Sequence, residues 1–304
     1  MSFEVPRKAA AGVAFALASL ASVPRTVAAG DAAVERGRYL FTAADCTSCH
    51  TDLEHKGAPL AGGPPLATAF GEFFAPNITP DPKFGIGRWS EADFHRALRS
   101  GIGRDGRYLY PVFPYPSFTH LTDRDISDIY AYLKTLKPVA QASRANEIKP
   151  PFGWRFPLRF WRMFFFREGP LPAVPGRSAE WQRGRYLAEA VGHCQECHTP
   201  RNVLGALDNT RAYSGNPNGP DRQDAPNITS DPSSAIATWS LDDVSQLLAT
   251  GQTPDFDFVG AGMAQVVKGT GALTDADRRA IAVYVKSLPP VHTEKRPKKP
   301  GGAT

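Results

Sequence analysis

Cysteine and methionine are scarce in this chain, which has four cysteines and three methionines among its 304 residues. All four cysteines lie in two copies of one pentapeptide, so no thiol remains for disulfide bonds elsewhere. Long apolar runs are rare too, and outside the N-terminal region none approaches the roughly 20 residues that a membrane-spanning helix needs. The formal net charge of +5 is too small to indicate a nucleic-acid-binding protein.

The N-terminal residues 1–29 have the pattern of a secretory signal peptide. Arg7 and Lys8 form a basic region, residues 9–23 are small and apolar, and residues 27–29 (VAA) suit a cleavage site. The apolar stretch is short for a bilayer span, so we expect cleavage rather than a retained anchor. The mature chain would begin near Gly30 and keep a net charge of +3, because the segment carries three basic residues and one acidic residue.

The two pentapeptides, residues 46–50 (CTSCH) and 194–198 (CQECH), match the C-x-x-C-H signature of covalent haem attachment. In such a site the two thiols add to the haem vinyl groups and the adjacent histidine is the proximal iron ligand. A thioredoxin-like motif needs no such histidine, and structural zinc sites use separated ligand pairs. We therefore predict two covalently bound haem c groups, attached by Cys46, Cys49, Cys194 and Cys197 and ligated by His50 and His198.

The chain is also a tandem repeat. Residues 34–40 recur at 181–187 and residues 75–82 at 225–232, and each copy has one haem motif near its start. About 275 residues after cleavage agree with roughly two domains. We expect five segments: the signal peptide (1–29), a first domain (31–143), a linker (144–176), a second domain (177–292) and a basic disordered tail (293–304).

Both copies have the patterns of helical domains, which predicts an all-α fold. Ser90 with Asp93 and Ser240 with Asp243 form equivalent helix-capping pairs. Thr122 and Thr274 each begin a further helix, whose apolar residues recur at helical spacing before Pro138 and Pro289. Gly37 and Gly184 lie in the first helix of each copy. Because glycine weakens a helix by about 1 kcal/mol, we expect each to mark a close crossing with the last helix.

The linker is rich in both aromatic residues and arginine. Residues 154–167 contain seven phenylalanines and tryptophans and four arginines. The segment is too short and too charged to cross a bilayer. Two interpretations remain: a peripheral membrane contact through aromatic and arginine side chains, or an ordered linker that packs across both domains. We favour the second, since exposed aromatic patches of this size are unusual.

The two haems are predicted to differ in their sixth ligand. Met263 lies twelve residues after Gly251, where a distal ligand loop is expected, and the equivalent position after Gly101 is Phe113. Methionine sulfur is a usual ligand that raises the potential, whereas phenylalanine has no lone pair. Three alternatives remain for haem 1. It is five-coordinate beside Phe113, it takes another ligand, or its distal loop aligns with that of haem 2 in a different register. The candidates for another ligand are His95, His120 and Met163.

Four stretches resemble the multihaem cytochrome c subunits that accompany periplasmic dehydrogenases: residues 77–81, 85–90, 104–111 and 193–202. Those subunits serve alcohol, gluconate and sorbitol dehydrogenases and molybdenum hydroxylases. The resemblance covers nearly the whole mature chain and implies two tandem class I cytochrome c domains. The alcohol dehydrogenase type usually has methionine where Phe113 stands, and the form with phenylalanine is more similar to the partners of molybdenum hydroxylases. Those subunits often carry three haems, whereas this chain has two motifs.

The resemblance implies a periplasmic dihaem cytochrome that transfers electrons and has no substrate pocket of its own. The expected donor is a periplasmic dehydrogenase: a molybdenum hydroxylase, a quinoprotein or a flavoprotein. The expected acceptor is a terminal oxidase of the respiratory chain or a small cytochrome. The alternative is a dihaem enzyme, peroxidase-like or oxidising a sulfur compound, that uses an open iron at haem 1. The apolar residues around Phe113 (PVFP, 111–114) disfavour that alternative.

Overall fold

The computed structural model describes residues 1–2, 4, 29–219 and 224–293, and every structural statement below refers to them. The predicted signal peptide and basic tail lie almost wholly outside this part of the chain. Within it, no helix has both the length and the apolar character needed to cross a membrane.

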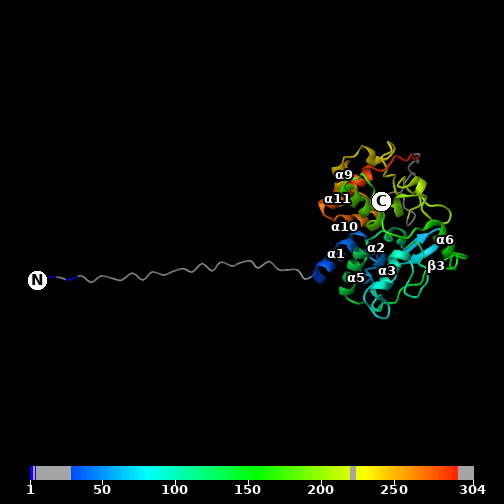
Figure 1. Cartoon of the computed structure of the whole chain (residues 1–304), viewed down its shortest axis with the longest axis horizontal. Helices are drawn as coiled ribbons and strands as arrows, with labels where there is room; N and C mark the ends of the chain where they lie inside the picture. The colour runs from blue at the N-terminus through cyan, green and yellow to red at the C-terminus, as the bar shows by residue number, and fades with distance from the viewer. Residues whose placement is uncertain (3, 5–28, 220–223, 294–304) are drawn as a thin grey trace.

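The first half of the fold is a set of helices in chain order, drawn in blue to green in the lower part of Figure 1. They are α1 (Ala29–Ala43), α2 (Cys46–His50), α3 (Glu91–Ser100), α4 (Tyr115–Phe118) and α5 (Asp123–Thr135). The predicted capping pair is confirmed at α3, where the Ser90 hydroxyl accepts the Asp93 amide and the Asp93 carboxylate accepts the Ser90 amide.

The second half repeats this order in the upper part of Figure 1. It contains α7 (Ala179–Tyr186), the π-helical turn η1 (Leu187–Val191), α8 (Gln195–His198), the 3₁₀ turns η2 (Asn209–Arg211) and η4 (Ala235–Thr238), α9 (Leu241–Thr250), α10 (Ala261–Thr270) and α11 (Asp275–Lys286). Ser240 and Asp243 form the same capping box at α9. The helices predicted after Thr122 and Thr274 are α5 and α11, and both threonines cap them.

The first and last helices of each half cross at the two predicted glycines. A Cβ atom built on Gly37 would lie 1.9 Å from the carbonyl oxygen of Asp128 on α5. A Cβ atom on Gly184 would lie 1.8 Å from the carbonyl oxygen of Ala280 on α11. The expectation of close crossings is therefore confirmed, because only glycine lets the two backbones approach this far.

The two halves contact one another through equivalent residues. The Tyr39 hydroxyl donates to Asp277 at 2.6 Å and accepts the amide of Thr274 at 3.1 Å, both at the start of α11. In the opposite direction, the Tyr186 hydroxyl donates to Asp125 and accepts the amide of Thr122 at 3.2 Å, both at the start of α5. Tyr39 and Tyr186 are equivalent residues of the repeat, and each bonds to the start of the last helix of the other half. This reciprocal arrangement is that of the self-complementary interface of a two-fold dimer.

The all-α expectation needs a correction, because a small antiparallel sheet is also present. Strands β1 (Pro65–Thr68), β2 (Gly71–Phe74) and β3 (Glu147–Ile148) pair in that order. Gly71 has φ +130° at the tight β1–β2 turn, a conformation that glycine adopts without strain. Since β3 belongs to the predicted linker, the linker adds a strand to the first half.

The rest of the linker contains α6 (Leu158–Phe165) and bonds to both halves. The Trp161 indole donates to the carbonyl of Leu204 in the second half at 3.0 Å. The Arg162 guanidinium donates to the carbonyl of Ser100 in the first half. These two bonds join α6 to both halves, although several aromatic side chains of this segment stay exposed.

Candidate functional site

The two C-x-x-C-H motifs form the short helices α2 and α8. The residue before each first cysteine has a left-handed backbone, with φ 50° at Asp45 and φ 39° at His193. All four thiols are described and none forms a disulfide. Burial raises the pKa of Cys194 to about 12 and that of Cys46 even further. The Cys46 and Cys194 thiols are therefore poorly ionised, unlike reactive or zinc-binding cysteines.

The two motif histidines are held in the same way. The Nδ1 atom of His50 lies 2.7 Å from the carbonyl oxygen of Pro76, and that of His198 lies 2.8 Å from the carbonyl oxygen of Pro226. A carbonyl can only accept, so Nδ1 carries the proton and Nε2 keeps its lone pair for a metal. Burial lowers the pKa of both histidines, although the carbonyl opposes it, which favours the neutral ring that ligates iron.

An asparagine follows each of these prolines, and its side chain bonds the loop to the end of its own half. Asn77 accepts from the amide and hydroxyl of Thr79 and donates to the carbonyls of Val139 and Gln141 at 2.8 and 2.9 Å. Asn227 bonds Thr229 in the same way and donates to the carbonyl of Val291 at 2.8 Å. The sequence showed these residues as a repeat but not their role, which depends on the end of each half folding back.

Both motifs face one cavity of about 3300 Å³. This is several times the roughly 300–1,000 Å³ of an ordinary ligand pocket. Its walls are largely apolar and repeat between the halves, with lining side chains that include Ile78, Trp89, Phe94, Leu98, Ile228, Trp239, Val244 and Leu248. Two thiols, a histidine with a free Nε2 and an apolar wall in each half fit a covalently attached haem.

The structure places Phe113 and Met263 in this same cavity. Phe113 precedes α4 and packs against Phe118, with 5.6 Å between ring centroids. Met263 is half-buried and lies in the first turn of α10 rather than in a loop, which corrects the expected setting of this residue. Both residues therefore border the cavity, and of the two only Met263 offers a sulfur atom.

The three other candidate ligands of haem 1 lie elsewhere. His95 Nε2 is 3.0 Å from Asp123, and His120 Nδ1 is 2.9 Å from the carbonyl of Gly169. Met163 is on α6 with 57% of its surface exposed. None of the three is among the described residues that line the cavity.

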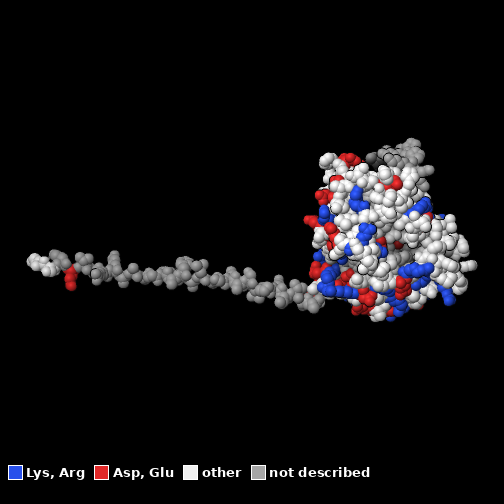
Figure 2. Space-filling model, turned by 45° about the horizontal axis from the view of Figure 1, so that its top comes forward, with Lys and Arg blue, Asp and Glu red and all other residues white. Residues whose placement is uncertain are grey.

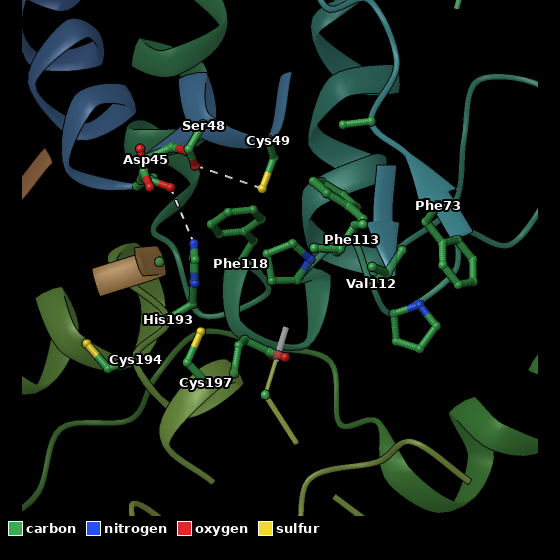
Figure 3. A pocket seen from close by; sticks show the side chains of 18 of the residues that line it. Asp45, Ser48, Cys49, Phe73, Val112, Phe113, Phe118, His193, Cys194 and Cys197 are labelled. Atoms are coloured by element: carbon green, nitrogen blue, oxygen red, sulfur yellow. Dashed lines mark hydrogen bonds between the residues drawn. The ribbon is translucent and has the colours of Figure 1, made fainter. Parts of the chain in front are cut away.

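Sequence reasoning missed two polar residues near the second motif that contact the other half, the half-buried His193 and the buried Glu196. His193 Nε2 lies 3.3 Å from the carbonyl oxygen of Ala44, and the ring packs edge-on against Phe118. Glu196 pairs with Arg201 and accepts from the Ser117 hydroxyl at 3.2 Å. Figure 3 shows His193 between Asp45 and the cysteines of the second motif. No local pattern marks these roles, because Ala44 and Ser117 come from the other half.

Comparison with known proteins gives consistent matches. The family described as Cytochrome c matches residues 34–137. The protein named Diheme cytochrome c-type from Cereibacter sphaeroides is 44% identical, over 84% of this chain and 86% of its own length. A nicotinate dehydrogenase polypeptide of Pseudomonas putida is 42% identical over 84% of this chain. The cytochrome c subunit of the quinone alcohol dehydrogenase of Komagataeibacter europaeus is 40% identical over 91% of this chain.

The extent of these matches differs among the relatives. This chain spans 60% of the length of the alcohol dehydrogenase subunit and 21% of the nicotinate dehydrogenase polypeptide. Both relatives therefore contain long regions with no counterpart in the matched segment.

Proposed function

This chain belongs to the cytochrome c family, and from that premise we propose that it is a periplasmic dihaem electron carrier. In this proposal it accepts electrons from a partner dehydrogenase and passes them toward the respiratory chain. Covalently bound haem c supplies the one-electron iron chemistry. The protein holds each haem, fixes its proximal histidine and excludes water from its faces with apolar side chains.

Each haem is assigned to one half of the fold. Cys46 and Cys49 would attach haem 1, with His50 as its proximal ligand. The equivalent residues for haem 2 are Cys194, Cys197 and His198, and Met263 would be its sixth ligand. The observation that carries this assignment is the matched pair of Nδ1–carbonyl hydrogen bonds, because each presents an unprotonated Nε2 to the same cavity.

The domain organisation is part of the proposal. Residues 31–143 and 177–292 would be class I cytochrome c domains joined by the linker 144–176. It is supported by the repeated order of helices, the paired capping boxes and the reciprocal tyrosine contacts.

A dehydrogenase is the proposed donor because several relatives are named as parts of such enzymes. These names include cytochrome subunits of alcohol, fructose and gluconate dehydrogenases, and one polypeptide of a nicotinate dehydrogenase. The pattern of residues 1–29 supports the periplasmic location. The acceptor would be an oxidase or a small cytochrome.

A peripheral membrane contact through α6 also belongs to this proposal. Trp154, Phe156, Phe160, Met163 and Phe164 have between 47% and 73% of their surfaces exposed. Arg159 and Arg167 are exposed beside them. Aromatic rings with neighbouring cations suit the interface of an anionic bilayer. In Figure 1, α6 lies at the edge of the molecule opposite α1, and Figure 2 shows that edge as mostly uncharged.

The test is the number and ligation of the haems in the purified protein. We expect two haems per chain and a near-infrared methionine-to-iron band equal to one haem. Met263→Leu should abolish that band, while Phe113→Met should add a second equivalent. A band of two equivalents in the unaltered protein would contradict the unequal ligation, and fewer than two haems would contradict the dihaem proposal.

The same protein can be tested for the alternative, a dihaem enzyme with an open haem 1 iron. Phe113 in the methionine position favours an open site, but Pro111, Val112 and Pro114 surround it with apolar groups. Turnover of peroxide or thiosulfate by the isolated protein would favour the enzyme. We expect no turnover above that of Phe113→Met.

A further inference from the structure

The helix that carries Met263 lies against the first half of the fold. In Figure 1, α10 is drawn beside α1, and the two helices are in contact. A Cβ atom built on Gly269, near the end of α10, would lie 2.5 Å from the carbonyl oxygen of Thr42 on α1. Gly269 is therefore needed for this close approach, since any side chain would force the two backbones apart. It is buried and is not among the described residues that line the cavity.

The turn from α10 to α11 is held by the same helix of the first half. Tyr39 lies one helical turn before Thr42 on α1, and its hydroxyl donates to Asp277 in the first turn of α11 at 2.6 Å. From the same turn, the Arg278 guanidinium donates to the carbonyl of Gly271 at 3.0 Å, at the C-terminal cap of α10. The first half thus contacts α10 directly at Thr42 and indirectly through the residues that follow the helix.

Opposite charges add to this contact. Asp45 follows α1 and directly precedes the first motif, and Lys268 is the neighbour of Gly269 on α10. Burial raises the pKa of the Asp45 carboxyl to about 6, while hydrogen bonds from Ser48 and the charge of Lys268 act in the other direction. The cation of α10 therefore stabilises the ionised carboxylate of the first half.

The opposite distal segment has an equivalent support. Ser117 on α4 corresponds to Gly269, because each stands four residues before the repeated Leu-Thr-Asp sequence. The Ser117 hydroxyl donates to Glu196 in the second motif at 3.2 Å. Phe118 beside it packs edge-on against His193, with 5.5 Å between ring centroids (Figure 3). The helices on the sixth-ligand side, α4 and α10, are thus each held by the other half of the chain.

We propose that the first half positions the sixth ligand of haem 2. Tyr39 and the backbone at Thr42 hold α10 in place, and Gly269 is the positioning residue that allows this contact. The inference rests on the proposed function, which makes Met263 that ligand. Because axial ligation sets the potential of a haem, the potential of haem 2 then depends on the packing of the helix that leads into the motif of haem 1.

The test uses imidazole as a competitor for the iron of haem 2 in the oxidised holoprotein. The iron–sulfur bond breaks and an iron–nitrogen bond forms, with no change in oxidation state, so loss of the near-infrared methionine band reports haem 2 alone. Tyr39→Phe removes a bond from the first half to α11. It should lower the imidazole concentration that halves the band by roughly threefold, the scale of a single hydrogen bond.

The matched control is Tyr186→Phe, which removes the equivalent bond from the second half to α5. Tyr186 and Met263 belong to the same half, yet this variant should leave the imidazole concentration at half-loss unchanged. The contrast is specific to the proposal, because a ligand held by its own half would respond to Tyr186 rather than to Tyr39.

A second pair of variants tests the close contact itself. Gly269→Ala must move α10 away from Thr42, so half of the band should be lost at a roughly tenfold lower imidazole concentration, the scale on which outer-shell support changes metal ligation. Gly184→Ala is the control, since its Cβ would lie 1.8 Å from the carbonyl oxygen of Ala280, at a crossing within the second half. It should lower the melting temperature and leave the imidazole concentration at half-loss unchanged.

Equal effects of Tyr39→Phe and Tyr186→Phe would overturn the inference, and so would an unaltered imidazole response in both Tyr39→Phe and Gly269→Ala. If Gly269→Ala does not assemble with haem, the tyrosine pair decides alone. A methionine band that is present but insensitive to the first half contradicts only this inference. No such band in the unaltered protein contradicts the Met263 ligation of the proposed function, and this inference with it.

Discussion

At the scale of single residues, two glycines determine how closely the helices of each half can pack. Gly37 and Gly184 stand where a side chain would overlap a carbonyl oxygen of the crossing helix. The neighbouring packing is specific, with Phe41 against Tyr132 in the first half and Trp181 against Tyr284 in the second. A small displacement of either helix pair would therefore disturb the apolar wall behind each motif.

We expect Gly37→Ala and Gly184→Ala each to lower the free energy of unfolding by about 3 kcal/mol, because the added methyl must push two backbones apart. Thermal unfolding of the holoprotein measures this. Gly153→Ala is the control, since the nearest atom to a Cβ there is 4.0 Å away. Equal melting temperatures for all three variants would show that the crossings can relax without cost.

At the scale of elements, α6 both bonds to the two halves and presents exposed aromatic rings. Trp161 and Arg162 tie it to both halves, while Phe160 and Phe164 are 47% and 65% exposed. The helix has only eight residues and cannot span a bilayer. Phe160 and Phe164 also line the cavity, and the proposed membrane contact would use the part of each ring that stays exposed.

Phe160→Ser with Phe164→Ser should weaken binding to anionic phospholipid vesicles at least tenfold, because two large apolar side chains no longer enter the interface, each worth about 1.5–3 kcal/mol when buried. Co-sedimentation measures this binding. Phe256→Ser removes a ring of the second half that is 82% exposed, and it should leave vesicle binding unchanged. If all three proteins sediment alike, α6 is not the membrane contact.

At the scale of the whole molecule, the halves are joined by the reciprocal tyrosine contacts. Burial alone would raise the pKa of Asp277, but hydrogen bonds from Arg183 and Tyr39 outweigh it and hold the pKa below its ordinary value. A carboxyl whose pKa is lowered by folding stabilises the fold above its unfolded pKa of about 3.9. That stabilisation is lost as the pH falls through the folded pKa.

Tyr39→Phe should therefore destabilise the protein by about 2 kcal/mol at pH 7, since it removes a hydrogen bond to a charged group. The difference from the unaltered protein should shrink below about pH 4, as Asp277 becomes protonated. Urea unfolding between pH 3 and 7 measures both effects. Tyr110→Phe is the control, because its hydroxyl donates only to backbone carbonyls, so its effect should not vary with pH. A constant loss for Tyr39→Phe would contradict the role of Asp277.

Features that depend on neighbours along the chain were predictable from the sequence. The motifs, the capping pairs at Ser90 and Ser240 and the repeat are all local, and the crossing glycines followed because a glycine in a helix needs a packing reason. The family also followed from these motifs. The sheet was missed, since β3 is two residues of a linker whose pairing with β2 depends on the fold of the first half.

Which distant groups meet depends on how the helices pack, and the structure was needed to show it. It joined both motifs in one cavity, placed Pro76 and Pro226 against the histidines, and kept His95 and His120 away from the cavity. It also gave the loops at residues 103–107 and 253–257 the same backbone hydrogen bond. These contacts join residues dozens of positions apart, and no periodicity or spacing along the chain encodes such distances, because they arise from how the helices pack.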